Sequence, residues 1–574
     1  GIHAPRRPVR RESMIRKLTP EDLDAVMHIW LSSNLEAHSF VPAAYWHGHF
    51  EQVRAVLPTA AVWLLMTLNR CPGKMVWWLF ILVFFAAFQL VLLYLFGHSI
   101  IAVDMFLNVV TTNPGEAFEL LDNLIPAVFG VVIVYVPVLI MAVVSIRSRQ
   151  RLERSFLLKQ RRYAAIAAAA GVLSLGVTYA TDREYRAELD LYPANVFYNL
   201  GLAVERTADT NAYAETSAHF TFNAKATHAA EEREVYVLVI GETARACNFS
   251  LYGYGRETTP RMAGMEGLVA FPKAITQSNT THKSVPMLLS AVSAEDFNSI
   301  YTQKGIITAF KEAGFHTVFI SNQRPNRSFI DFFGEEADEW TFIKERNPEA
   351  AAIGDEAMLP EVAKTLAKGR KKEFIVLHMY GSHFNYRERY PRQAAFFKPD
   401  DATEAKAKNR EQLVNAYDNT IRFTDSFIAE LSAMLGKTGA QSALLYTSDH
   451  GENIFDDSRR LFLHASPVPS YYELHVPLVV WMSDSYRQAY APIETALRAN
   501  SGKRIATSAS VFHTMLTIAG IETPLRRDSL STASPRFTVT PCLYLDDHNN
   551  AVPTSKLLRS EKDFEKFKEA GIGM

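Results

Sequence analysis

The hydrophobic residues of this 574-residue chain are concentrated in its first third. Positions 75–96 and 124–145 form two runs without a charged side chain, and positions 163–180 form a shorter and weaker one. Since a helix rises about 1.5 Å per residue, each of the two longer runs can cross a hydrocarbon core of roughly 30 Å. We therefore predict three membrane-spanning helices, within a transmembrane region at 55–180.

The connection between the second and third predicted spans is strongly basic. Short loops rich in Lys and Arg remain on the cytoplasmic side, so the segment 97–123 and everything after 181 are predicted to lie outside the cytoplasm. The basic residues of this connection are Arg147, Arg149, Arg151, Arg154, Lys159, Arg161 and Arg162.

From about residue 232 the pattern changes to short apolar runs of β-branched residues that alternate with amphipathic stretches. This alternation predicts an α/β domain at 232–574 with a mostly parallel sheet and crossover helices. The segment 181–231 is predicted to be a linker with short helices. Three of the apolar runs lie at 235–242, 373–383 and 442–452, and each finishes on polar residues.

Composition excludes some classes of protein. Hydrophobic residues make up 48% of the chain, and 60 basic residues face 61 acidic ones, so no global positive field would gather nucleic acid. Of the three cysteines, Cys71, Cys247 and Cys542, only the last two would lie outside the cytoplasm. At most one disulfide is therefore available there, and the sequence leaves open whether the pair forms.

The first 54 residues differ in character from the rest of the chain. The stretch that begins MIRKLTPEDLDAVMHIW at Met14 resembles the opening of a GNAT acetyltransferase, but the chain enters the membrane where that fold needs a Gly-rich loop. We expect no acetyltransferase activity from it. The apolar run Ala60–Leu68 is too short to span a bilayer.

The polar ends of the three strand-like runs suggest a metal site. They carry Glu242, His383, and the group Asp449, His450 and Glu452. Taken singly, each has an ordinary explanation, as a first-turn acid, a loop histidine or a turn residue. Ligands of open α/β sheets bind outside the carboxyl ends of strands, and these residue types suit Zn²⁺ and, less well, Mn²⁺.

The stretch SNTTHKSVP, 278–286, places Thr280 and Thr281 just before the apolar run MLLS, which looks like a helix start. Helix capping is the ordinary explanation for such hydroxyls. A hydroxyl beside a divalent cation and at a helix N-terminus is also an activated nucleophile. We therefore expect Glu242, Asp449 and His450 to hold the metal and Thr281 to complete the site.

At these motifs the chain resembles a known family. GETARACNFSLYGYGRETTPRM at 241–262, the T-x-x-S-V-P pattern from Thr281 and SDHGE at 448–452 are similar to the phosphoethanolamine transferases of the Gram-negative inner membrane, which include the mobile colistin-resistance enzymes. The resemblance implies an alkaline-phosphatase/sulfatase-like fold, a zinc site formed by Glu242, Thr281, Asp449 and His450, and Thr281 as the nucleophile.

The resemblance also implies residues that bind substrate. His383 and His464 match two pocket histidines that contact the phosphoethanolamine group or a second zinc ion, and either could protonate a leaving oxygen. Glu452 matches an acid that faces the substrate ammonium. Asn108, Thr112 and Glu116 match residues that approach the pocket from the membrane side, and their i, i+4, i+8 spacing suits one helix face, although capping and solvation explain them as well.

Some positions depart from the family pattern. Gln277 and Met287 stand where lipid A enzymes commonly have cysteines, and His282 and Lys283 replace small residues, which leaves the acceptor open. SNQRPNR at 321–327 could bring polar side chains to the phosphate without fixing individual roles. Those side chains are Asn322, Gln323 and Arg327.

The resemblance predicts a monomeric, multi-pass enzyme of the bacterial inner membrane with its catalytic domain in the periplasm. Phosphatidylethanolamine would donate its headgroup, and lipid A or the lipopolysaccharide core would accept it, which would reduce polymyxin binding. Three alternatives remain: a periplasmic phosphodiesterase or phosphatase, a glycerol-phosphate transferase, and an inactive scaffold. Sulfatase activity is not expected, because no Cys or Ser stands in a C/S-x-P-x-R context.

Overall fold

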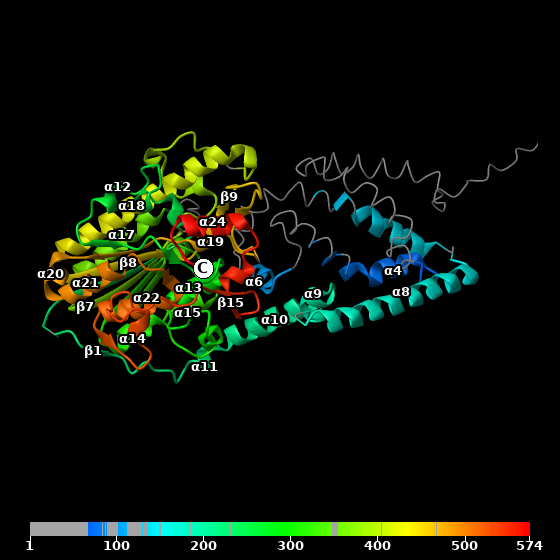
Figure 1. Ribbon diagram of the computed structural model, residues 1–574, viewed down its shortest axis with the longest axis horizontal. Helices are drawn as coiled ribbons and strands as arrows, with labels where there is room; N and C mark the ends of the chain where they lie inside the picture. Colours follow the sequence, from blue (N-terminus) through cyan, green and yellow to red (C-terminus); the bar gives the residue numbers. More distant parts are fainter. Residues whose placement is uncertain are drawn as a thin grey trace, which may run out of the picture. The chain divides into compact units, whose positions relative to one another are not determined.

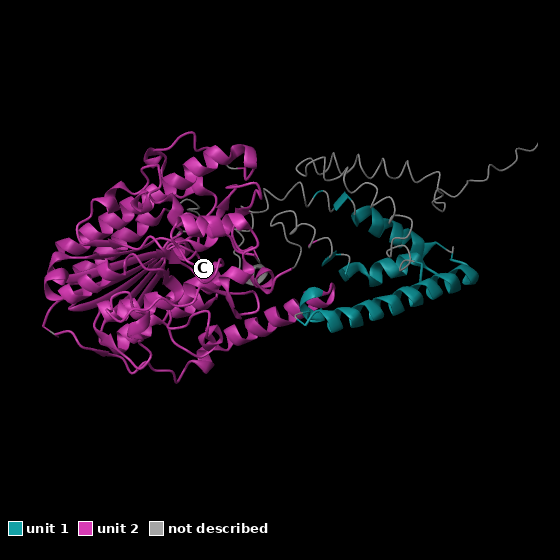
Figure 2. Ribbon diagram, in the orientation of Figure 1, with its two compact units in different colours: residues 1–87, 124–190 teal, residues 88–123, 191–574 magenta. Residues whose placement is uncertain are grey.

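Figure 1 shows the elements of the chain in a computed structural model, and Figure 2 shows its division into two compact units. Unit 1 contains residues 1–87 and 124–190, and unit 2 contains residues 88–123 and 191–574. The structure describes residues 67–82, 84–85, 88, 101–111, 129, 132–133, 135–148, 151–183, 185–229, 231–346, 354–402, 404–466 and 468–574.

Unit 1 contains one helix that is long and apolar enough to cross a membrane, among the residues described. This helix, α8 (Arg154–Thr181), has 28 residues and a mean hydropathy of 1.6 in its most apolar window. It begins nine residues before the predicted span at 163–180, so Arg154, Lys159 and Arg161 lie in its first turns and not in a loop. The predicted spans at 75–96 and 124–145 are only partly described, by α4 (Pro72–Trp78) and an apolar helix at Tyr135–Arg147.

In unit 2, α6 (Val103–Thr111) packs against α10 (Ala194–Asn211). Buried residues of α10 recur every three or four positions at Val196, Asn199, Ala203 and Arg206, which is the spacing of one helix face. In the sequence, α10 is preceded by the single turn α9 (Ala187–Asp190), which belongs to unit 1, and followed by the single turn α11 (Tyr213–Thr216).

The centre of unit 2 is a seven-stranded sheet. Five neighbouring strands, from β8 to β6, are parallel, and β11 is antiparallel to both β8 and β3. The expected mostly parallel α/β sheet is confirmed. In spatial order the strands are β3 (Leu268–Ala270), β11 (Leu478–Met482), β8 (Gln441–Ser448), β2 (Glu234–Gly241), β7 (Lys372–His378), β5 (His316–Ser321) and β6 (Glu339–Phe342).

Helices cover both faces of the sheet. Alternate residues of β2 enter opposite cores, with Tyr236 and Leu238 in one and Val235 and Val237 in the other. The first core is covered by α13 (Thr281–Leu288), α14 (Ile306–Glu312) and α22 (Thr507–Ile518), and the second by α17 (Met358–Ala367) and α18 (Arg410–Lys437). Because β2 is buried on both faces, it reads as a continuous apolar run.

The remaining elements are short and surround this framework. The helices are α12 (Pro260–Ala263), α15 (Phe329–Gly334), α16 (Ile343–Arg346), α19 (Tyr471–Leu474), α20 (Asp484–Ala489), α21 (Ala491–Asn500), α23 (Thr554–Leu557) and α24 (Glu561–Glu569). The strands are β1 (Lys225–Ala226), β4 (Ala274–Ile275), β9 (Asn453–Ile454), β10 (Phe462–Leu463), β12 (Ile505–Ala506), β13 (Ile521–Glu522), β14 (Leu543–Leu545) and β15 (Ala551–Pro553).

Candidate metal centre and nucleophile

The carboxyl ends of β2 and β8 bring three metal-ligating residue types together. Gly241 pairs with Ser448 in the parallel ladder, so Glu242 and Asp449 are the next residues on adjacent strands. His450 follows Asp449, and one potential ligand atom from each of the three residues lies within 4.8 Å of the others. The ladder therefore holds residues that are some 200 positions apart in the sequence.

The protonation of His450 suits a metal ligand. Its Nδ1 lies 2.9 Å from the carbonyl oxygen of Gly451, and since a carbonyl can only accept, Nδ1 carries the hydrogen. The other nitrogen, Nε2, then presents a lone pair, 3.1 Å from Asp449 Oδ2 and 3.5 Å from Glu242 Oε1. A lone pair that faces two carboxylates requires a proton or a metal cation between them, and a divalent cation would satisfy all three groups at once.

Burial sharpens this requirement. All three side chains are buried, which raises the pKa values of Glu242 and Asp449, and the pKa of Glu242 is raised further by the charge of Asp449. Burial also lowers the pKa of His450 well below its ordinary value. Two oxygen donors and one imidazole nitrogen in a water-excluded site fit Zn²⁺.

Thr281 opens α13 and points at this cluster. Its Oγ1 lies 3.1 Å from Glu242 Oε1 and 3.1 Å from His450 Nε2. The helix begins at Thr281 and not at the apolar run from Met287, and the side chain of Thr280 makes no capping hydrogen bond. Capping therefore does not explain this pair of hydroxyls.

Neighbouring hydroxyls hold the two carboxylates in place. The Thr243 hydroxyl donates to Glu242 Oε1 at 2.8 Å, and its backbone N–H donates to Asp449 Oδ1 at 3.0 Å. Thr243 has a φ of +62°, which is costly for a β-branched residue and typical of functional sites. The Ser284 hydroxyl lies 2.9 Å from the carbonyl oxygen of Thr280 and 3.4 Å from Asp449 Oδ2.

Gln323 is a further contact of the metal cluster, which the sequence left without a role. Its Nε2 donates to Glu242 Oε2 at 3.2 Å and to the carbonyl oxygen of Met379 at 2.9 Å. Asn322 instead donates to Asp355 Oδ1, and the backbone N–H of Arg327 donates to Asp331. Gln323 lies two residues after the end of β5, and nothing in the sequence distinguished it from its neighbour Asn322.

His464 lies beside His450, and Glu452 lies beside His464. The ring centroid of His464 is 4.2 Å from that of His450 and 6.2 Å from that of His383. Its Nδ1 is 3.4 Å from Glu452 Oε2, and the hydroxyl of the buried Tyr386 is a second hydrogen-bonding neighbour of the Glu452 carboxylate. The structure thus brings His383, His464 and Glu452 to the same site.

These histidines have opposite electrostatic environments. Burial would lower the pKa of His464, but the carboxylates of Glu452, Glu242 and Asp449 together raise it. Burial lowers the pKa of His383 to about 3, and the nearby charges of Arg389 and His464 lower it further.

Other predicted residues are placed less fully. Thr112 and Glu116, and the side chain of Asn108, lie outside the described residues, although the backbone of Asn108 is part of α6. Cys247 and Cys542 are both free thiols, so the disulfide that the sequence left open is not formed.

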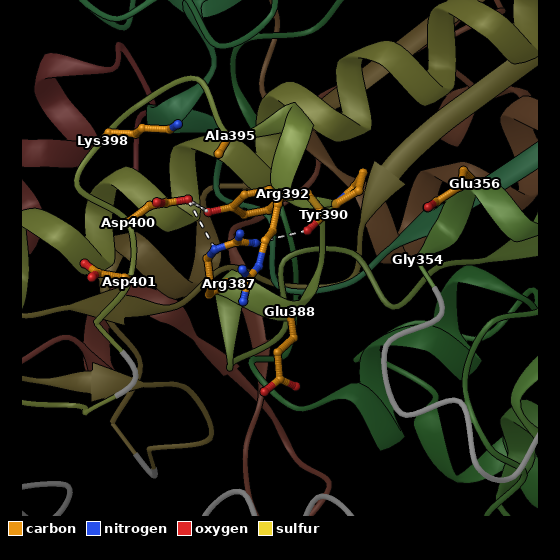
Figure 3. A pocket seen from close by; sticks show the side chains of 11 residues that line it. Gly354, Glu356, Arg387, Glu388, Tyr390, Arg392, Ala395, Lys398, Asp400 and Asp401 are labelled. Carbon is orange, nitrogen blue, oxygen red and sulfur yellow. Dashed lines mark hydrogen bonds and ion pairs between the residues drawn. The ribbon is translucent and has the colours of Figure 1, made fainter.

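A separate pocket of about 790 Å³ is lined by residues between 387 and 401 together with Gly354 and Glu356 (Figure 3). Two of its lining residues, Arg387 and Asp400, lie 3.4 Å apart. None of the lining residues belongs to the metal cluster, so the pocket is distinct from the candidate centre. Its charged lining residues are Glu356, Arg387, Glu388, Arg392, Lys398, Asp400 and Asp401.

Relatives of this chain are phosphoethanolamine transferases. The Kdo(2)-lipid A phosphoethanolamine 7''-transferase of Salmonella typhimurium is 29% identical over 309 residues, which are 51% of this chain and 52% of that protein. The chain thus spans about half the length of the curated relatives it matches.

Two solved structures share the fold. The integral membrane lipooligosaccharide phosphoethanolamine transferase A (EptA) of Neisseria meningitidis has a TM-score of 0.63 and 24% identity, over 88% of this chain and 95% of that one. The C-terminal periplasmic domain of EcEptC from Escherichia coli, in complex with Zn, has a TM-score of 0.54 and 22% identity, over 59% of this chain and 98% of that one.

A family model described as Sulfatase matches residues 234–521. That range contains every strand of the central sheet and all three residues of the candidate metal cluster. The chain belongs to the sulfatase family.

Proposed function

We propose that this chain transfers phosphoethanolamine from phosphatidylethanolamine to lipid A or the lipopolysaccharide core, through a covalent intermediate on Thr281. The observation that carries the proposal is the position of Thr281 Oγ1, 3.1 Å from both Glu242 Oε1 and His450 Nε2 at the start of α13. The identity of the transferred group is inferred from the relatives that are named as phosphoethanolamine transferases.

Glu242, Asp449 and His450 would hold a zinc ion. When bound, this ion would supply Lewis-acid charge, which lowers the pKa of a neighbouring hydroxyl and offsets charge on phosphoryl oxygens. Two buried carboxylates that face an imidazole lone pair support this assignment. The zinc complex of the related EcEptC domain supports the choice of metal.

The first half-reaction forms a phosphothreonine ester. Thr281 Oγ1 attacks the phosphorus of phosphatidylethanolamine, its proton passes to a basic side chain of the site, and the bond between phosphorus and the diacylglycerol oxygen breaks. That oxygen takes a proton and leaves as diacylglycerol. His383 and His464 are the candidates to donate this proton, and His464 suits the role better, because nearby carboxylates raise its pKa whereas burial lowers the pKa of His383 to about 3.

Glu452 would recognise the ethanolamine ammonium. Its carboxylate is buried beside His464 and the hydroxyl of Tyr386. A buried carboxylate is costly unless a cation is paired with it, and a substrate ammonium would supply that positive charge. Asn108, Thr112 and Glu116 would contact the donor from the membrane side.

The second half-reaction returns the enzyme to its starting state. A hydroxyl or phosphate oxygen of lipid A or of the core attacks the phosphothreonine phosphorus, and Thr281 Oγ1 leaves and regains a proton. The added ammonium group reduces the negative charge of the acceptor, which would weaken binding of cationic peptides such as polymyxin.

The membrane context of the proposal rests on three predicted spans, of which α8 is described in full. We propose a multi-pass protein of the bacterial inner membrane, with residues 55–180 as the transmembrane region, 181–231 as the linker, and the domain at 232–574 in the periplasm. The integral membrane structure of N. meningitidis EptA has the same fold over 88% of this chain.

Intact-protein mass spectrometry tests the proposal. The full-length chain, loaded with zinc and incubated with phosphatidylethanolamine, should gain the mass of one phosphoethanolamine group on Thr281, and Thr281→Ala should gain none. Rapid release of free phosphoethanolamine without an acceptor would instead identify a phosphodiesterase. An adduct that carries glycerol phosphate would identify the other transferase class.

A further inference from the structure

Asp104 of α6 contacts the two residues that directly follow Thr281. Its Oδ2 lies 2.8 Å from the ammonium of Lys283, and its Oδ1 lies 3.2 Å from Nε2 of His282. The side chain of Lys283 is only 3% exposed. A cation this deeply buried needs a partner of opposite charge, and Asp104 supplies it.

The segment that carries Asp104 is itself fixed to the catalytic unit. Asp547 accepts hydrogen bonds from the backbone N–H groups of Val103 and Asp104, at 2.6 and 2.9 Å, and so caps the start of α6. Arg206 of α10 donates to the carbonyl oxygen of Asp547 at 2.9 Å, and its guanidinium lies 3.8 Å from Asp104. Asp104 therefore reaches α13 from an anchored helix.

The contacts of Asp104 fall on the first turn of α13. The backbone N–H groups of Lys283 and Ser284 both donate to the carbonyl oxygen of Thr280, and this turn sets the direction of Thr281 Oγ1. The Lys283 ammonium also donates to the carbonyl oxygen of Asp546 at 2.9 Å, which holds the far side of the same turn.

We propose that Asp104 is a positioning residue for the nucleophile: its contacts with His282 and Lys283 hold the first turn of α13 so that Thr281 Oγ1 faces Glu242 and His450. The predicted effect on the reaction rests on the proposed function, in which Thr281 is the nucleophile. It assigns a role to His282 and Lys283, and it links the segment between the first two predicted membrane spans to the reacting hydroxyl.

The link predicts a specific kinetic signature. Asp104 does not touch Glu242, Asp449 or His450 in any contact of the described residues, so its loss should leave zinc content unchanged. A misplaced nucleophile lowers the rate of the chemical step, by as much as 10²-fold for an error of about 1 Å. We expect Asp104→Asn to lower the single-turnover rate of adduct formation by roughly 10–100-fold, with an unchanged KM for phosphatidylethanolamine.

The experiment uses the full-length chain in nanodiscs that contain phosphatidylethanolamine. Asp104→Glu, which keeps the charge, should restore most of the rate. The double variant Asp104→Asn with Lys283→Met should be no slower than the slower single variant, because the two side chains act through one contact. Glu234→Gln is the matched control: this buried acid also pairs with a lysine, Lys372 at 3.3 Å, but lies at the opposite end of β2, so its variant should keep the wild-type rate.

Hydrogen exchange of the Lys283 and Ser284 amides gives a readout that does not depend on activity. These amides should exchange faster in Asp104→Asn than in the wild type and in Glu234→Gln. A wild-type adduct rate in Asp104→Asn, or unchanged exchange in it, would overturn the inference. If the wild type formed no adduct, the proposed function would fail and the exchange rates alone would decide the inference.

Discussion

Replacing Gln323 by leucine removes a single hydrogen bond from the candidate metal cluster without removing a ligand. Gln323 Nε2 donates to Glu242 Oε2 at 3.2 Å, while the opposite oxygen of that carboxylate accepts from Thr243. Leucine has a similar volume and cannot donate. We expect the Glu242 carboxylate of the variant to lose its fixed orientation and zinc to bind more weakly.

The size of the effect follows from the charge of the acceptor. A hydrogen bond to an ionised group contributes about 1.5–3 kcal/mol, and about 1.4 kcal/mol corresponds to a tenfold change in affinity. Zinc affinity should therefore fall roughly 10- to 100-fold, which is the usual cost of losing a partner that orients a metal ligand. The carbonyl oxygen of Met379 also loses a donor, so we expect about 1 kcal/mol less stability.

Competition with a chromophoric chelator measures this affinity in the purified full-length chain. Gln441→Leu provides the control, because Gln441 begins β8 at the end of the sheet opposite the cluster and its side-chain oxygen has no hydrogen-bond partner among the described residues. Equal zinc dissociation constants for Gln323→Leu, Gln441→Leu and the wild type would refute the role that we assign to Gln323.

Three further predictions concern the nucleophile, the metal and acid stability. Thr281→Ser should keep adduct formation and Thr281→Ala should abolish it, as read by intact mass; an adduct in the alanine variant would place the nucleophile elsewhere. Chelation of zinc should lower the free energy of unfolding by about 2–4 kcal/mol, because the metal binds only the folded state. The same melting temperature with and without chelator would show that the metal does not stabilise the fold. Burial, together with the charges of Arg527 and Arg526, lowers the pKa of His513 from 6.5 to about 3. Between these pH values the histidine is protonated in the unfolded chain but not in the folded one, so the free energy of unfolding decreases as the pH falls below 6.5. Between pH 7 and 5 this histidine should cost about 2 kcal/mol. In urea titrations over that pH range, His513→Gln should lose less unfolding free energy than the wild type. The same loss in both proteins would contradict this prediction.

The sequence predicted the elements that carry most of the candidate site. The apolar run at 235–242 became β2, and the run that ends at Asp449 became β8, because strands buried on both faces are continuously hydrophobic. Once neighbouring parallel strands were expected, their carboxyl ends had to meet at one edge. Glu242 could therefore be expected close to Asp449 and His450 from the amino-acid pattern alone.

Contacts that depend on packing between distant segments of the chain could not be predicted. Gln323 and Asp104 are ordinary polar residues, and nothing in their local sequence names the partners at Glu242 and Lys283. The sequence placed Thr281 at a helix N-terminus, but it did not show that the first turn of α13 buries polar residues such as Lys283 and Ser284, because an apolar pattern cannot reveal such a turn.

The pairing of Gly241 with Ser448 has a consequence for the order in which the molecule matures. Neighbouring side chains along a strand point to opposite faces, so a slip of one position between these strands would turn either Glu242 or Asp449 away from the other. A chain in which these strands pair in the wrong register would lack the complete set of metal ligands. Metal uptake would therefore come after long-range strand assembly, and holding a divalent ion would distinguish correctly threaded molecules from misassembled ones.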